Sequence, residues 1–313
     1  MKQKIFYSKI LLFGEYGIIH DSMGLAVPYP LFQGELNFQT DFRINQINID
    51  NELKAFSKYL KNVSKNFKEL SSFDADSFEF DVSQGLCFQS TIPQGYGVGS
   101  SGALCASVYH RYCADLQNDS FETFDKNRLA ELKKIFSIME AHFHGASSGI
   151  DPLISYVNQA VLIKGLNNVD IIKQPVLKKK SAGGIFLLNT ARPRRTEPLV
   201  NLFLEKCKET TFRNLCESIL LPIINGCINS FLSSDKKTLF NFFQRLSDFQ
   251  YCHFDPMIPH LFKEVWYEGL KSEVFYLKLC GAGGGGFLLG ITENFDEAKD
   301  KLQGHEIRPL YFL

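Results

Sequence analysis

The segment with the densest set of chemically useful residues is FQSTIPQGYGVGSSGALCASVYHRYC, residues 88–113. Its glycines, at alternate positions from Gly95 to Gly99, let the backbone take positive φ and approach a ligand closely. Ser100 and Ser101 follow where a helical pattern begins, so the unpaired N–H groups of the first helical turn would face this loop. Such a site binds anions, and phosphate is the usual one. The alternative is a plain glycine turn in which Ser100 caps the helix.

Two better-known glycine motifs do not explain this loop. A literal G-x-G-x-x-G runs from Gly97 to Gly102, but a dinucleotide-binding fingerprint would follow the first buried parallel strand and open a βαβ unit. This match lies deep in the chain, after several strands with antiparallel character. A second match, from Gly281 to Gly286, precedes a strand and not a helix. No Lys-Ser or Lys-Thr follows the glycines, so the P-loop pattern is absent as well.

Three charged residues elsewhere could take part in phosphate chemistry, and each also has an ordinary structural explanation. Asp151, in HGASSGIDPLI, is followed by proline, which is typical of a helix N-cap. Lys9 precedes the apolar run ILLF, and a strand lysine commonly extends to solvent. Glu140 lies on a predicted helix, where exposed glutamates are common. His142 and His144 stand two positions apart, so they do not share one helix face, which argues against a zinc site.

A mixed fold must position these residues, because strand-like and helix-like patterns both occur along the chain. Strands are predicted at 5–7, 10–13, 31–50, 78–82, 86–92 and 160–163, in the apolar part of SAGGIFLLNT, on both sides of the second glycine loop, and at 307–312. Helices are predicted at 52–69, at 100–113, around Leu129 to Met139, and at 295–302. The predicted fold class is therefore α+β.

The length of 313 residues favours two domains around separate cores. A fresh strand pattern starts after the run Lys178–Lys180, so we place the boundary there, with domains at residues 1–180 and 181–313. The second part is helix-rich and then reads strand, glycine loop, strand, helix, strand. That order is typical of a ferredoxin-like α+β domain.

The composition narrows the class of protein. Lys plus Arg equals Asp plus Glu, at 34 each, so no net charge favours nucleic acid or an anionic membrane. The eight cysteines form no C-x-x-C pair, and several lie in apolar runs, which suits buried thiols in a reducing compartment. We recognise neither a signal peptide nor an apolar run long enough to span a bilayer. These features predict a cytoplasmic protein.

Three segments carry a family resemblance. IPQGYGVGSSGAL resembles the P-x-x-x-G-[LV]-G-S-S-A-A loop of the GHMP kinases, a family of small-molecule kinases. SKILLFGEYGIIHDSMGLAVP and LKLCGAGGGGFLLGI resemble the family's other two motifs, and the three occur in the family's order. The resemblance implies an N-terminal domain similar to ribosomal protein S5 domain 2, a C-terminal ferredoxin-like domain, and an active site between them.

The resemblance also implies the site's residues and its cofactors, ATP and Mg²⁺. Asp151 matches the catalytic aspartate that receives the hydroxyl proton, and Lys9 matches the lysine that pairs with it. Glu140 matches the Mg²⁺-binding glutamate, with Ser101 as the second ligand. The residues expected to hold ATP are Pro93, Gly95, Gly97, Gly99, Ser100, Ser101 and Gly102.

Within the family, KILLFGEY, HGASSGID and LLNTARPRRT are most similar to the mevalonate kinases, whose segments read close to K-x-I-L-F-G-E-H, H-G-x-P-S-G-x-D and N-T-x-x-P-R-x-T. The resemblance implies phosphorylation of the 5-hydroxyl of mevalonate, and it leaves open phosphomevalonate, a sugar, or a catalytically silent nucleotide-binding regulator. The residues expected near the substrate are Glu15, Tyr16, Arg194, Thr196, Gly281, Ala282 and Gly283.

Three residues depart from the family pattern: Tyr16 replaces a histidine, Pro152 an asparagine, and Gly102 an alanine. The glycine should weaken the start of its helix by about 0.5–1 kcal/mol without removing an N–H donor. The expected partners are ATP and a small alcohol, with no nucleic acid and no membrane. The sequence does not fix the oligomeric state, and a homodimer is one of the states it allows.

Overall fold

The computed structural model describes residues 4–38, 50–113, 124–165, 168–173, 180–193 and 197–313. Its strands are β1 (Phe6–Phe13), β2 (Met23–Phe38), β3 (Leu86–Ser90), β4 (Ala160–Lys164), β5 (Val169–Ile172), β6 (Gly184–Asn189), β7 (Phe275–Leu279), β8 (Phe287–Thr292) and β9 (Ile307–Phe312). Its α-helices are α1 (Asn51–Val63), α2 (Ala75–Ser83), α3 (Ser100–Tyr112), α4 (Lys126–His144), α5 (Ile150–Val157), α6 (Glu197–Lys206), α7 (Thr210–Leu215), α8 (Leu221–Leu232), α9 (Lys236–His253), α10 (Lys263–Ser272) and α11 (Phe295–Lys301).

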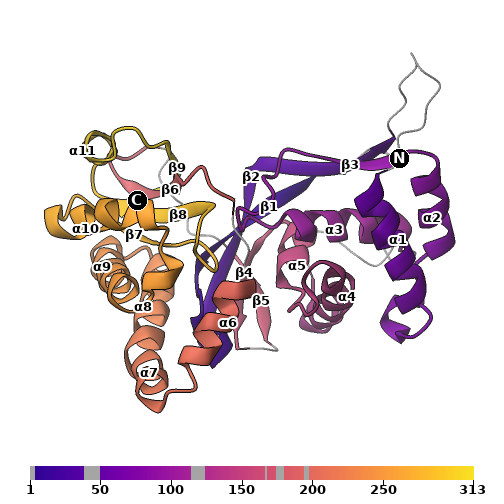
Figure 1. Cartoon of the computed structure of the whole chain (residues 1–313), viewed down its shortest axis with the longest axis horizontal. Coiled ribbons are helices and arrows are strands. Elements are labelled where there is room, and N and C mark those ends of the chain that lie inside the picture. The colour runs from indigo at the N-terminus through magenta and orange to yellow at the C-terminus, as the bar shows by residue number, and fades with distance from the viewer. Residues whose placement is uncertain (1–3, 39–49, 114–123, 166–167, 174–179, 194–196) are drawn as a thin grey trace.

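The first antiparallel sheet has the order β1-β2-β4-β5, with β3 also paired to β2. Helices α3 and α5 pack against β1 and β2, and α8 from the second half of the chain packs against the same two strands. Figure 1 shows α3 and α5 on one side of these strands and α8 on the other. The sheet therefore lies in the middle of the molecule. Helices from both halves of the chain contact strand β1.

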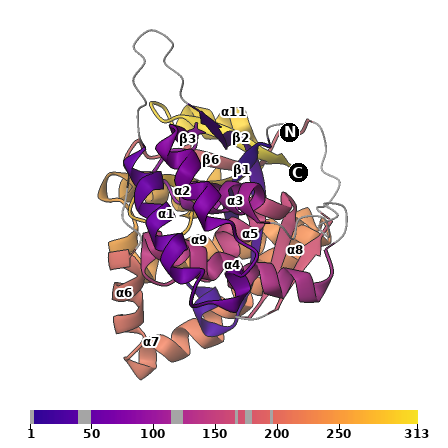
Figure 2. The ribbon, with the colours of Figure 1, turned by 90° about the vertical axis from the view of Figure 1, so that its right-hand side faces the viewer.

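The second antiparallel sheet has the order β7-β8-β6-β9, and helices α9 and α10 pack against β7. Every residue of β7 and β8 is buried, because helices and neighbouring strands cover them. The order β7, glycine loop, β8, α11, β9 is the one predicted for the ferredoxin-like half. Figure 2 shows the molecule after a quarter turn, with α1 and α2 toward the viewer.

The predicted strand at 78–82 is wrong, because these residues lie in helix α2. The side chain of Asp74 accepts a hydrogen bond from the amide of Ser77 and caps this helix. Phe78 and Val82 are one helical turn apart, and both are buried. The short strand β5 was not predicted, and β2 begins at Met23, earlier than the predicted start at residue 31.

The predicted domain boundary at 180/181 falls between the two sheets. All strands of the first sheet end by Ile172, and all strands of the second begin from Gly184 onward. Residues 174–179 lie outside the described part of the chain. The boundary itself stays a prediction.

One helical stretch differs from the expectation that no segment is long and apolar enough to span a bilayer. Thr210–Leu232, formed by α7, a π-helical turn at Cys216–Leu220 and α8, meets that length and composition. Its α8 part packs against β1 and β2 and buries Ile224, Cys227 and Phe231 there. In this fold the apolar face of the stretch covers the central sheet.

Candidate active site

The predicted lysine–aspartate pair is formed. Lys9 on β1 places its Nζ 2.8 Å from Oδ2 of Asp151, although 141 other residues separate the two in the sequence. The side chain of Lys9 is 8% exposed and that of Asp151 is 37% exposed, so the lysine is held inside while the carboxylate reaches the surface.

The suggestion that Asp151 is a helix N-cap is wrong. Helix α5 begins at Ile150, and its N-cap is Gly149, which has φ of 71°. Asp151 therefore lies inside the first turn, where the helix dipole favours a negative charge. Its carboxylate is not used to cap the helix and is free to pair with Lys9.

The first glycine loop has the geometry of an anion site. Gly95, Gly97 and Gly99 all have positive φ, of 76°, 74° and 83°. Helix α3 begins at Ser100 with Gly99 as N-cap and without a side-chain cap, so Ser100 is not the N-cap that the alternative explanation required. The N–H groups of the first turn of α3 have no acceptor within the helix.

The glycine loop rests directly on the catalytic lysine candidate. The amide of Lys9 donates a hydrogen bond to the carbonyl of Val98 at 2.9 Å. A Cβ atom on Gly99 would lie 2.9 Å from Cγ of Lys9, so only glycine lets the loop approach this closely. The N-terminal end of α3 and the Lys9–Asp151 pair therefore lie next to each other.

The two residues predicted to hold Mg²⁺ also meet. Ser101 Oγ donates to Oε1 of Glu140 at 3.1 Å, and Glu140 on α4 is buried, not exposed as the ordinary explanation assumed. A hydroxyl and a carboxylate are hard oxygen ligands of the kind that Mg²⁺ takes. The residues present thus fit the ion by their chemistry. The contact also favours Ser101 over Ser100 as the serine involved.

The pKa of Glu140 is raised to about 7, mainly by burial and then by the nearby charge of Asp151, while Ser147, Ser101 and Lys9 act in the opposite direction. A free glutamate in the unfolded chain titrates near 4.5. Between these values the folded protein keeps a proton that the unfolded chain has lost, so stability falls as pH rises through this window.

A Glu140→Gln variant removes this titration. We expect the unfolding free energy of the variant, relative to the parent, to rise by up to about 3 kcal/mol between pH 5 and pH 8 in the absence of metal and nucleotide. Urea unfolding followed by circular dichroism at several pH values would measure this. Parallel stability profiles of variant and parent would contradict it.

Two residues near Glu140 were not predicted. His144 Nε2 lies 3.0 Å from Oγ of Ser101, and Ser147 Oγ donates to Oε2 of Glu140 at 2.5 Å. The sequence analysis considered His144 only together with His142, as zinc ligands. The two rings diverge, because His142 packs against the rings of two aromatic residues of α1, Phe56 and Tyr59.

The first and third motifs are joined by buried polar contacts. Glu15 Oε1 lies 2.6 Å from Nζ of Lys278 on β7, and neither side chain is exposed by more than 1%. Burial raises the pKa of Glu15, and Lys278 opposes this shift. The hydroxyl of Tyr16 donates to the carbonyl of Ala282 at 2.6 Å. The polar atoms of Glu15 and Tyr16 therefore contact the third motif, and their contact with a substrate stays a prediction.

The third motif in turn packs against the first glycine loop. Gly281 and Gly283 have φ of 72° and 78°. A Cβ atom on Gly286 would lie 2.5 Å from the carbonyl oxygen of Tyr96 in the first loop, and one on Gly283 would lie 2.4 Å from the carbonyl oxygen of Met257. These close backbone approaches explain why the loop contains so many glycines.

Gly102 is required by packing more than by helix propensity. A Cβ atom there would lie 2.8 Å from the carbonyl carbon of Asp151 and 2.9 Å from the nitrogen of Pro152. Two of the three departures from the family pattern, Gly102 and Pro152, are therefore in contact. The glycine lets α3 lie against the start of α5, which carries the catalytic aspartate candidate.

A Gly102→Ala variant should be less stable than the parent by about 1–3 kcal/mol, because backbone atoms that cannot move aside meet the added methyl group. Alanine's better helix propensity, about 1 kcal/mol, would offset only part of this. Ser100→Ala, in the same helical turn, is the matched control. Thermal unfolding of both variants is the measurement, and a Gly102→Ala variant more stable than the parent would contradict this account.

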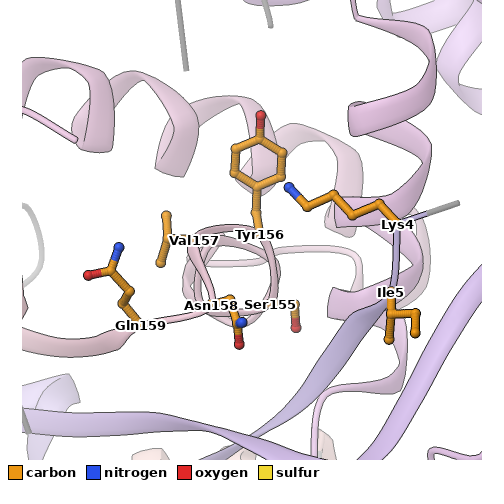
Figure 3. Close-up of a pocket in the computed structure, with 7 residues that line it drawn as sticks. All are labelled: Lys4, Ile5, Ser155, Tyr156, Val157, Asn158 and Gln159. Atoms are coloured by element: carbon orange, nitrogen blue, oxygen red, sulfur yellow. The ribbon is translucent and has the colours of Figure 1, made fainter. Parts of the chain in front are cut away.

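Two predicted substrate residues, Arg194 and Thr196, lie outside the described residues. The structure also has a pocket of about 430 Å³ near the C-terminal end of α5, with Lys4 and Tyr156 on its wall and Asn158 at its base (Figure 3). Within the described part of the chain, none of the predicted site residues lines this pocket. It lies at the opposite end of α5 from Asp151, so it is separate from the candidate active site.

Residues 58–159 match the family model described as GHMP kinases N terminal domain. The mevalonate kinase of Dictyostelium discoideum is 26% identical over 244 residues, which cover 68% of this chain and 58% of that relative. This chain thus aligns with less than two thirds of the relative's length.

Solved structures show the same fold. The L. major mevalonate kinase in complex with R-mevalonate matches with a TM-score of 0.63 at 14% identity, over 97% of this chain and 91% of that one. A Streptococcus pneumoniae phosphomevalonate kinase in complex with phosphomevalonate and AMPPNP matches with a TM-score of 0.64 at 12% identity, over 99% and 100%. The chain has the fold of the GHMP kinases, and its residues 58–159 match the N-terminal domain of that family. Among those kinases it is similar to the mevalonate kinases in sequence and in fold.

Proposed function

We propose that this protein is an ATP- and Mg²⁺-dependent small-molecule kinase that phosphorylates the 5-hydroxyl of mevalonate. The observation that carries the proposal is the 2.8 Å contact between Lys9 and Asp151 beside the open first turn of helix α3. A glycine loop, a helix start, a buried lysine and a carboxylate that reaches the surface are what phosphoryl transfer to an alcohol requires.

In this proposal Asp151 accepts the proton of the attacking hydroxyl, because its carboxylate pairs with Lys9 and is still 37% exposed. Lys9 holds that carboxylate in place and stabilises negative charge that develops on the substrate oxygen. The hydroxyl oxygen bonds to the γ-phosphorus of ATP, the bond from that phosphorus to ADP breaks, and the proton goes to Asp151. The N–H groups at the start of α3 bind the phosphates.

Glu140 and Ser101 would hold the metal ion, which when bound neutralises charge on the nucleotide phosphates. The chain's own part is to present the two oxygen atoms, 3.1 Å apart, at the end of α4 and the start of α3. A catalyst is favoured over a silent nucleotide-binding regulator, because the chain has all three charged residues of the proposed site: Lys9, Glu140 and Asp151.

Mevalonate as the acceptor is supported by the three similar segments and by the Dictyostelium discoideum relative. Gly281, Ala282 and Gly283 would form one wall of the substrate site, held in place by Glu15 and Tyr16. Arg194 and Thr196 would supply polar groups to the substrate. The similarity in fold to a phosphomevalonate kinase makes phosphomevalonate the second candidate.

A coupled assay of ADP release over mevalonate, phosphomevalonate, galactose and homoserine tests the proposal. We expect Mg²⁺-dependent turnover with mevalonate and little with the other three. Turnover with phosphomevalonate or galactose alone would keep the kinase and replace the acceptor. ATP binding without turnover of any acceptor would favour the regulator.

A further inference from the structure

The carboxylate of Glu140 is held at both of its oxygen atoms. Ser101 Oγ contacts Oε1 at 3.1 Å, and Ser147 Oγ donates to Oε2 at 2.5 Å. These two hydroxyls come from different elements, the start of α3 and the connection between α4 and α5. The carboxylate therefore has one defined orientation, with Oε1 directed at Ser101.

Ser147 is itself fixed by its neighbours. Its Oγ accepts a hydrogen bond from the amide of Gly149 at 3.0 Å, and its carbonyl accepts one from the hydroxyl of Ser137 at 2.6 Å. Gly149 is the N-cap of α5, two residues before Asp151. One serine thus joins Glu140 to the helix start that carries the proton acceptor.

This contact is a property of this chain. The segment HGASSGID has Ser147 where the similar segment H-G-x-P-S-G-x-D has proline. A proline side chain has no hydroxyl and donates no hydrogen bond to a carboxylate. A chain with proline at this position therefore lacks this hydrogen bond to Oε2.

We propose that Ser147 is a positioning residue for the metal ion of the proposed kinase: its hydroxyl holds Oε2 so that Oε1 and the Ser101 hydroxyl face the cation together. The inference rests on the proposed function. Ser147 acts through Glu140, because its Oγ contacts the oxygen that is turned away from Ser101. Hydrogen-bond partners of this kind commonly set metal affinity, and their loss weakens binding by about 10–100-fold.

The test measures binding of Mn²⁺, used as a probe for Mg²⁺, to the full chain in the presence of ADP, by electron paramagnetic resonance of free Mn²⁺. We expect Ser147→Ala and Ser147→Pro each to weaken Mn²⁺ binding by at least about 10-fold. The Ser147→Thr variant, which keeps the hydroxyl, should bind Mn²⁺ as the parent does. Ser148→Ala is the matched control, because the Ser148 hydroxyl accepts from the amide of Ile150. The parent's affinity should persist in that variant.

Kinetics give a second measurement. The Mg²⁺ concentration for half-maximal rate should rise in Ser147→Ala, with the mevalonate KM unchanged. A Ser147→Ala variant with lower thermal stability but unchanged Mn²⁺ affinity would overturn the inference and leave the proposed function intact. A parent protein that binds no Mn²⁺ with ADP and turns over no acceptor would overturn both.

Discussion

An Asp151→Asn variant is expected to turn over its substrate at least about 100-fold more slowly than the parent, with little change in its affinity for ATP. Asparagine has the same shape and still accepts a hydrogen bond from Lys9, but its neutral amide does not take up the proton of the attacking hydroxyl. Loss of rate with retained binding is the sign of a group that acts in the transition state.

The matched control is Asp170→Asn. Asp170 lies on β5, outside the three motifs; its Oδ2 pairs with Nζ of Lys164 at 3.0 Å and its Oδ1 with Nζ of Lys126 at 3.3 Å. A pair of this kind contributes at most about 1 kcal/mol, and we expect the rate of this variant to equal that of the parent. Initial-rate kinetics with the preferred acceptor give both values. If Asp151→Asn kept more than a tenth of the parent's rate, the lysine–aspartate pair would be a structural contact and the proposed chemistry would be wrong.

The largest loss of stability is expected from Lys278→Met. The side chains of Lys278 and Glu15 are exposed by no more than 1%, and their charged atoms lie 2.6 Å apart. Removal of one partner leaves a carboxylate buried without its cation, which typically lowers stability by about 3–5 kcal/mol. The loss should be smaller at low pH, because burial raises the pKa of Glu15 and protonation removes the unpaired charge.

The double variant Glu15→Gln with Lys278→Met should recover part of that loss, because it removes both charges. Lys61→Met is the surface control: Lys61 contacts Asp76 and Glu79, its side chain is 37% exposed, and its loss should change stability far less than Lys278→Met does. Urea unfolding of the three variants and the parent measures these differences. A double variant less stable than Lys278→Met would show that the pair stabilises the fold beyond charge compensation.

The active-site chemistry was more predictable from the sequence than the contacts that support it. The structure brings the predicted residues together in two pairs, Lys9 with Asp151 and Ser101 with Glu140. Family motifs and their spacing had indicated these four residues. Lys278 was missed, although it is the one charged residue in the apolar run VFYLKLC, which is typical of a buried strand. A lone lysine in such a run indicates a buried partner, but sequence alone does not identify Glu15 as that partner.

Other contacts had no sequence signal at all. The direction of the Ser147 hydroxyl depends on the path of the chain between α4 and α5, which Gly145 and Gly149 set through positive φ. The close approach of α3 to Asp151 and Pro152, which makes Gly102 necessary, arises only when the two helices are packed together. For the fold, strand propensity misled at Phe78 and Val82, where the cap at Asp74 and helical burial decide the structure.

Strand β1 belongs to the first sheet, yet Glu15, just past its end, supplies the partner of a lysine in the second. A fragment that begins at residue 181 would therefore carry an ammonium group into its interior with nothing to neutralise it. The later half therefore needs Glu15 of the earlier half to neutralise its buried Lys278. The N-terminal half leaves the ribosome first during synthesis. Glu15 is therefore already present when Lys278 is added to the chain.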